Sequence, residues 1–157
     1  MSSHSDSVAA LRFFGEDLEP DEITRILGRA PTRSGRMGDT HTSPSSGQVR
    51  VESFGSWILD ATPTQPIDLD AQVAELFGSL VKDADVWAAL SQKYHPDLFC
   101  GAFFDAGGGG IDLTPRTMKL LGDRGVAFAC CIYCNTQDES IKANQEPAAP
   151  STPETRD

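Results

Sequence analysis

Hydrophobic and polar residues follow two different periods along this chain. A period of two, which is typical of β-strands, occurs in VAALRFFG at 8–15, GSWILDA at 55–61 and VAFACCIYC at 126–134. A fourth stretch, PDLFCGAFFD at 96–105, is apolar on both faces, which predicts a strand in the interior of a sheet.

Helical spacing occurs between these strands. The stretches DLEPDEITRILG at 17–28 and DLTPRTMKLLG at 112–122 each predict one helix, because Pro20 and Pro115 suit a first helical position and apolar residues recur every three or four positions. The segment 68–94 has two apolar stripes, which predict two helices or one kinked helix.

These elements together predict an α+β fold. We expect a two-layer sandwich with a mostly antiparallel sheet of four or five strands, helices mainly on one face and an inserted helical segment at 68–94. A ferredoxin-like arrangement is one topology that fits. Residues 8–136 form the single domain, residues 1–7 are expected to be disordered, and residues 137–157 are expected to be a disordered, acidic, proline-rich tail.

Size and composition fit one cytoplasmic domain. The chain has 157 residues, of which 39% are hydrophobic, enough for a single core. No apolar run approaches the roughly 18 residues that cross a bilayer, and the start MSSHSDSV does not have the pattern of a secretory signal. The four cysteines are therefore expected to be reduced thiols in a cytoplasm.

The charge is negative overall and positive in one loop. A formal net charge of −10 argues against nucleic-acid binding and favours a basic protein partner, if the chain has one. The loop 29–50 has the opposite sign, with Arg29, Arg33, Arg36 and Arg50 against one acid. Two of these arginines, Arg33 and Arg36, are candidates to clamp a phosphate or carboxylate.

Cysteines cluster in FACCIYC at 128–134, where Cys131 and Cys134 form a C-x-x-C pair. In an extended strand, residues three apart face opposite sides of the sheet, whereas redox pairs of this spacing lie at a helix N-terminus. We therefore interpret these cysteines as residues that pack in a strand, and metal or redox chemistry is the alternative.

The glycine-rich stretch DAGGGGID at 105–112 has no lysine followed by serine or threonine after its last glycine, so it is not a phosphate-binding loop of the known type. A flexible hairpin link between two strands is the simpler interpretation. The alternative is a weak anion site at the amides after Thr114, helped by Arg116.

Two hypotheses for function remain. The first is a non-enzymatic, immunity-like or regulatory protein-binding module whose acidic surface engages a basic protein. The second is a small-anion or metabolite-binding domain, or a cryptic enzyme. Its ligand-binding residues would be Arg33, Arg36 and Trp57, at the mouth of a site at the end of the sheet. We predict no catalytic residue, metal or cofactor.

Three segments carry a family resemblance: LRFFGEDLEPDEITRILGRAPTRSGRMGD at 11–39, GSWILDA at 55–61, and LFCGAFFDAGGGGIDLTPRTMKLLGDRGVAFACCIY at 98–133. They resemble a bacterial family described as domain of unknown function 4279. The resemblance implies a small cytoplasmic α/β domain and no assigned reaction. Members commonly read D-I-Y near the end, whereas this chain has Cys131 in place of the acid.

The positions that carry the resemblance are mainly glycine, proline and apolar residues, which turns, helix starts and cores require. They therefore support a fold more than a function. These positions are Gly15, Asp17, Pro20, Ile23, Leu27, Gly28, Pro31, Gly38, Trp57, Leu113, Pro115, Leu121 and Tyr133.

Overall fold

A computed structural model of the chain describes residues 5–135. The disorder expected at residues 1–4 and 137–157 concerns residues outside this range. The described elements follow in the order β1 (Ser5–Gly15), α1 (Pro20–Leu27), β2 (Arg33–Gly35), β3 (Thr40–Thr42), β4 (Val49–Val51), β5 (Gly55–Asp60), α2 (Leu69–Gly78), α3 (Ala84–Tyr94), β6 (Asp97–Phe104), α4 (Pro115–Asp123) and β7 (Ala127–Cys134).

The main sheet has five strands in the order β2-β5-β1-β6-β7. Every neighbouring pair is antiparallel except β6 and β7, which are parallel. The predicted α+β class and mostly antiparallel sheet are confirmed. The order β2-β5-β1-β6, with α1 and then α2 and α3 as connections, is that of the ferredoxin-like split β-α-β, and α4 and β7 extend it.

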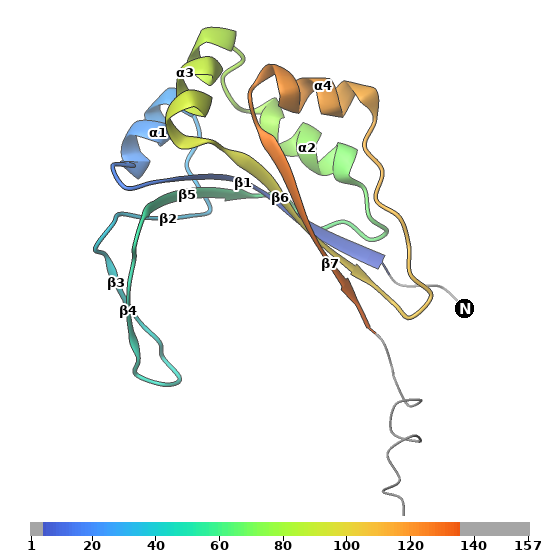
Figure 1. Ribbon diagram of the computed structural model, residues 1–157, viewed down its shortest axis with the longest axis horizontal. Helices are drawn as coiled ribbons and strands as arrows, with labels where there is room; N and C mark the ends of the chain where they lie inside the picture. The colour runs from blue at the N-terminus through green and yellow to red at the C-terminus, as the bar shows by residue number, and fades with distance from the viewer. Residues whose placement is uncertain (1–4, 136–157) are drawn as a thin grey trace, which may run out of the picture.

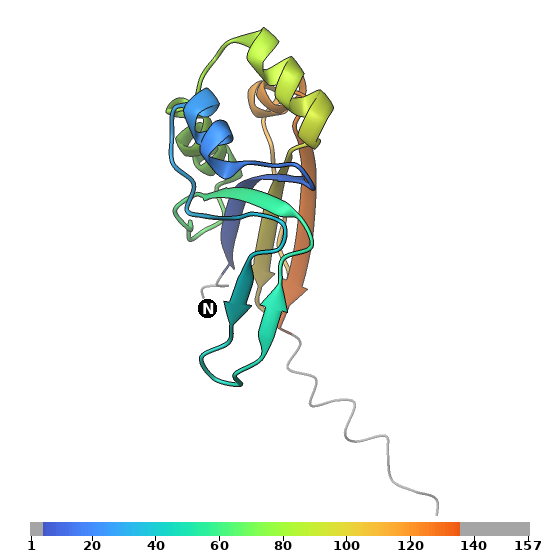
Figure 2. The ribbon, with the colours of Figure 1, turned by 90° about the vertical axis from the view of Figure 1, so that its left-hand side faces the viewer.

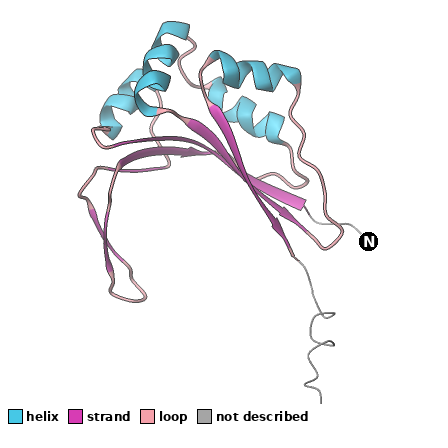
Figure 3. Ribbon diagram, viewed as in Figure 1, coloured by secondary structure: helices cyan, strands magenta, loops and turns pink. Residues whose placement is uncertain are grey.

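The helices form one layer on one face of the sheet (Figure 1, Figure 3). The core lies between the layers, and its largest fully buried side chains include Phe13 and Trp57 from the sheet and Trp87 from α3. Phe13 is the centre of this cluster, with ring centroids 5.6 Å from Trp57 and 6.2 Å from Trp87. The prediction of helices mainly on one face is confirmed.

Helix α1 forms where the sequence predicts it. Pro20 occupies the first turn, and Gly28 ends the helix with a left-handed φ of 79°. Leu18 and Ile23, five positions apart on either side of the helix start, are both buried in the core, as a hydrophobic staple requires.

Strand β1 begins earlier than the sequence suggests. Its first residue is Ser5, so the expected disorder of residues 1–7 is wrong for positions 5 to 7. A buried glutamine explains the difference: the Gln72 Oε1 accepts a hydrogen bond from Ser7 Oγ at 2.8 Å, and its Nε2 donates to the carbonyl oxygens of Ser7 and Thr62. These bonds join the start of the strand to α2.

Loop 29–50 contains structure that the sequence did not predict. It includes β2, β3 and the start of β4, and β3 pairs with β4 in a separate two-stranded hairpin. The hairpin extends from the edge of the main sheet on the side away from the helices (Figure 1, Figure 2). Its three-residue strands are exposed on all sides, so they have no burial pattern for a sequence analysis to detect.

The glycine-rich stretch connects β6 to α4, so its interpretation as a link between two strands is corrected. It packs closely against the sheet at one point: a Cβ added to Gly109 would lie 2.3 Å from the Phe104 ring. Strand β6 lies in the interior of the sheet as predicted, although the central strand is β1.

Gly55, the first residue of β5, is required by close packing. A Cβ at this position would lie 2.5 Å from the carbonyl oxygen of Leu18. We expect Gly55→Ala to lower the free energy of unfolding by about 1 to 3 kcal/mol, the usual cost of overpacking. Urea denaturation followed by circular dichroism measures this. Gly78→Ala, which meets no atom within 4 Å, is the matched control and should not destabilise the fold; equal effects of the two substitutions would contradict the prediction.

Candidate functional site

The face of the sheet opposite the helices carries many exposed apolar side chains; we call it the open face. Of the large apolar residues that are exposed in the described part of the chain, most lie on this face or on the hairpin beside it. They are Val8, Phe14, Val49, Val51, Phe54, Phe103 and Tyr133. Phe103 and Tyr133 stack on each other across β6 and β7, with ring centroids 4.9 Å apart.

Arg12 lies at the middle of the open face, on β1. Its guanidinium donates two hydrogen bonds to Asp97 on β6, at 2.8 and 2.7 Å. The same group lies 4.4 Å from the centroid of the Phe99 ring and 5.3 Å from that of Phe14. The hydrogen bonds to Asp97 are the largest cause of a raised pKa for Arg12. The positive charge of Arg12 is thus held in place by Asp97 and lies beside two aromatic rings.

A cleft of about 450 Å³ lies between the hairpin and the open face. Phe14, Ile58 and Phe54 are apolar parts of its lining, and Arg33 and Arg50 bring positive charge. A second hollow of about 380 Å³ shares Arg33 and continues over the middle of the sheet.

A third hollow, of about 490 Å³, lies at the ends of β6 and β7. Phe103 and Tyr133 form part of its wall, together with Asp6 and Asp105. The three hollows make the open face an uneven surface, on which apolar side chains lie beside charged groups of both signs, among them Glu52 and Asp60.

The structure does not bring together the three residues predicted to bind a ligand. Arg33 is on the open face, where its guanidinium contacts Asp60 at 3.0 and 3.3 Å, and it lines both the cleft and the second hollow. Its side chain is largely exposed. Of the three predicted residues, Arg33 is the one that lines any of the three hollows described above.

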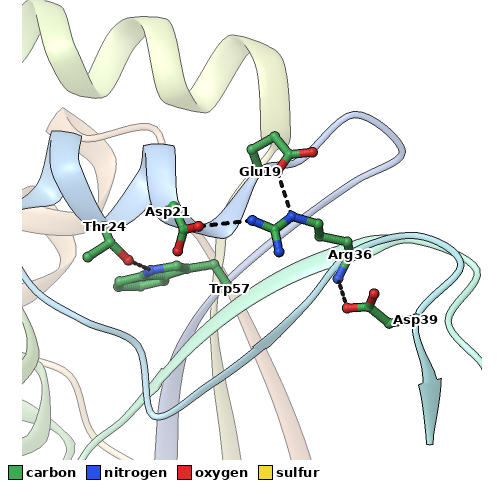
Figure 4. Close-up of polar contacts among 6 residues, drawn as sticks. All are labelled: Glu19, Asp21, Thr24, Arg36, Asp39 and Trp57. Atoms are coloured by element: carbon green, nitrogen blue, oxygen red, sulfur yellow. Dashed lines mark hydrogen bonds and ion pairs between the residues drawn. The ribbon is translucent and has the colours of Figure 1, made fainter.

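Arg36 is bound to helix α1 (Figure 4). Its Nε donates to Glu19 at 2.7 Å, its Nη2 donates to Asp21 at 2.9 Å, and its backbone N–H donates to Asp39. The hydrogen bond to Glu19 is the largest cause of its raised pKa. Because two carboxylates already occupy the guanidinium, Arg36 joins the loop to α1 and is not a free anion clamp.

Trp57 belongs to the core. Its side chain is 0% exposed, and its Nε1 donates to Thr24 Oγ1 of α1 at 3.1 Å (Figure 4). The prediction that Trp57 lies at the mouth of a site is therefore corrected. A tryptophan on the helix side of a strand satisfies its one donor beneath the helix layer, and a ligand on the open face does not reach it.

The residues that sequence reasoning missed are Arg12, Phe14, Phe103 and Tyr133. The sequence contains part of the information needed to find them, because β1 and β6 carry large side chains on both of their faces. For β6, this pattern predicts only a strand in the interior of the sheet. The sequence also predicts helices mainly on one face, but it does not identify which residues of each strand lie on the uncovered face.

The cysteines lie on an extended strand, as predicted. Cys131 pairs in register with Gly101 and Cys134 with Phe104, so the two thiols are on opposite faces of the sheet. All four cysteines are free. The packing interpretation holds for Cys130, which lies against the core, but Cys131 and Cys134 are exposed. Burial raises the pKa of the neighbouring Cys100 thiol to about 12.

The predicted anion site at the start of α4 is occupied by a side chain of the protein itself. Asp70 of α2 accepts hydrogen bonds from the Thr114 N–H at 3.2 Å and from the Thr114 hydroxyl at 3.1 Å, and also from the hydroxyl of Thr117. These bonds, of which the one from Thr117 has the largest effect, lower the pKa of Asp70. The helix start is therefore a junction between α2 and α4.

The family model described as Domain of unknown function (DUF4279) matches residues 4–135. The chain belongs to this family. No curated protein and no solved structure matches it. The described part of this DUF4279 protein has no helix that is both long and apolar enough to span a bilayer, and no group of three or more metal-ligating side chains within residues 5–135.

Asp70 gives a pH-dependent prediction for this DUF4279 domain. Its pKa in the folded protein lies below the ordinary value of 3.8. The ionised Asp70 therefore stabilises the fold above that pH, and this stabilisation is lost as the pH falls through the folded-state pKa. We expect Asp70→Asn to lower the free energy of unfolding near neutral pH by about 1 kcal/mol, the size of a lost helix cap, and by less in acid. Chemical denaturation across pH measures both effects.

Asp112→Asn is the control, because Asp112 is exposed and precedes the same helix. The variant with asparagine at position 112 should follow the wild-type pH profile. A loss of stability in Asp70→Asn that stays constant down to acidic pH would contradict the role of the Asp70 charge.

Proposed function

We propose that this protein is a cytoplasmic, non-enzymatic binding module that docks a basic protein partner on the open face. The observation that carries the proposal is the exposed apolar surface on this face and hairpin, defined above by seven residues from Val8 to Tyr133. Exposed apolar residues scattered singly need no explanation, but a group on one uncovered sheet face is typical of a protein-binding surface.

Aromatic residues and arginine give this face the chemistry of an interaction hot spot. The Phe103–Tyr133 stack and the Arg12 group between Phe14 and Phe99 are rigid, because each is held by contacts within the protein. Rigid aromatic and arginine side chains lose little conformational entropy on binding and dominate the energy of many interfaces.

The overall charge supports a basic partner. The chain carries a formal charge of −10, and five exposed acids lie between positions 16 and 22, beside the start of α1. Such a field speeds the approach of a positively charged protein, while the apolar face supplies the contact area. An immunity-like or regulatory role is the form of function that this combination favours.

The experiment is affinity capture from a lysate of the source cells, with the wild-type chain and two variants as bait. Phe103→Ser removes one ring of the stack on the open face, and Met118→Ser is the matched control at an exposed apolar residue of α4. We expect wild type and Met118→Ser to capture the same basic protein. Phe103→Ser should capture about tenfold less of it or lower still, as for loss of a hot-spot residue.

Binding kinetics with the purified partner then test the charge. The association rate should fall with added salt, while the dissociation rate changes little. Equal capture by all three baits would refute the open face as the docking surface. An acidic partner, or an association rate independent of salt, would refute the role assigned to the charge.

A small anion in the cleft is the second candidate. The observation that favours it is Arg50, which lines the cleft, is exposed and has no ion-pair partner within residues 5–135. Arg33 lies in the same lining, and the neighbouring aromatic rings suit an anion with a flat apolar part.

Thermal-shift screening against phosphorylated and carboxylated metabolites tests this candidate. A ligand at 100 times its Kd should add about 2.7 kcal/mol to the free energy of unfolding and raise the Tm. Arg50→Ala should abolish the shift, whereas Arg116→Ala, an exposed arginine on α4, should keep it. A shift that survives Arg50→Ala would place the ligand elsewhere, and the absence of any shift would remove this candidate.

A further inference from the structure

Strand β7 is the outermost strand of the main sheet, and one of its two edges faces β6. The N–H of Ala127 donates to the Pro96 carbonyl at 3.0 Å, and the N–H of Asn135 donates to that of Phe104 at 2.9 Å. Because backbone groups alternate in direction along a strand, the odd-numbered residues of β7 face β6. The N–H and C=O groups of the even-numbered residues therefore point away from the sheet.

Within Ala127–Cys134, this outer edge lacks the charges, the proline and the short length that discourage strands from pairing with other chains. The sequence of β7, AFACCIYC, contains no charge, no proline and no glycine over eight residues. The opposite edge, strand β2, is only three residues long and carries Arg33. Long, uncharged edge strands pair readily with another strand, whereas short or charged ones do not.

Both faces of β7 carry exposed apolar side chains. Phe128 and Ile132 point to the helix side, where they are 42% and 60% exposed. Tyr133 points to the open face and is 51% exposed. Another strand placed against β7 would cover side chains on both faces at once.

We propose that β7 pairs with β7 of a second copy of this chain, antiparallel and about a two-fold axis at Cys131. In this register all four outward-facing residues of β7 form backbone hydrogen bonds to the second copy. Cys130 lies opposite Ile132 of the second copy, and Phe128 lies opposite Cys134. The two-fold axis repeats each of these pairs, which gives four opposed pairs. Each pair exchanges two backbone hydrogen bonds, about eight in all. Registers centred on Cys130 or Ile132 leave outward groups at one end unpaired.

The sequence of β7 fits its own copy in this register. On the open face, Tyr133 lies opposite Ala129 and Cys131 opposite itself, and on the helix side the large Phe128 lies opposite the small Cys134. Large residues thus meet small ones, and no like charges meet, because the strand has none. A two-fold axis also closes the assembly at two copies and leaves no further β7 edge exposed.

The first test is the mass of the full chain in solution by analytical ultracentrifugation. We expect twice the 16.9 kDa of one chain. Ile132→Pro removes an outward N–H without altering a bond to β6, so this variant should sediment as a monomer. Ile132→Val keeps the N–H and should remain a dimer. A wild-type chain that stays monomeric at its solubility limit would overturn the proposal.

The second test reports the register and does not depend on how Ile132→Pro folds. Opposed residues of a non-hydrogen-bonded antiparallel pair have Cα atoms about 4.5 Å apart, within the range of a disulfide. Copper–phenanthroline with oxygen should therefore join two Cys131 thiols, taking up two electrons as both thiols lose their protons. Non-reducing electrophoresis should show a covalent dimer that Cys131→Ser abolishes and Cys134→Ser keeps.

A dimer that crosslinks through Cys134 instead of Cys131 would refute this register. A dimer that Ile132→Pro and Ile132→Val form equally well would refute the β7 edge as the interface.

Discussion

The handedness of three crossovers explains why the helices cover one face of the sheet. α1 joins the parallel strands β1 and β2, α2 and α3 join β5 and β6, and α4 joins β6 and β7. The first connection starts at β1 and leads toward the β2 edge of the sheet. The other two start at β5 and β6, which run antiparallel to β1, and lead toward the β7 edge. Right-handed crossovers with this relation all place their helices on the same face.

A one-sided helix layer determines what each strand residue does. On the covered face, Phe13, Trp57 and Trp87 form the centre of the core. On the open face, the same strands place Arg12 between aromatic rings and in a two-bond contact with Asp97. The contact fixes the arginine and partly covers the sheet, but it leaves apolar surface in contact with water, and covering such surface lowers the free energy.

Local patterns were sufficient to predict most of the fold but little of the site. Helix α1 and strand β5 follow from their own residues, because proline, glycine and apolar spacing act within a few positions. The partners of Arg36 do not follow in this way, since Glu19 and Asp21 come near it only when the loop after β2 packs against α1. The β3–β4 hairpin is equally hard to predict, because its short strands bury nothing.

The two edges of the sheet would allow the proposed partner binding and the proposed self-association to coexist. The cleft lined by Arg33 and Arg50 lies at the edge formed by β2 and the hairpin, whereas β7 is the edge at the other end of the strand order. Pairing through β7 would therefore leave the cleft accessible and would join the open faces of two copies into one surface. Two linked docking surfaces bind a partner that has repeated contacts more tightly than either does alone, because the second contact forms at a high effective concentration.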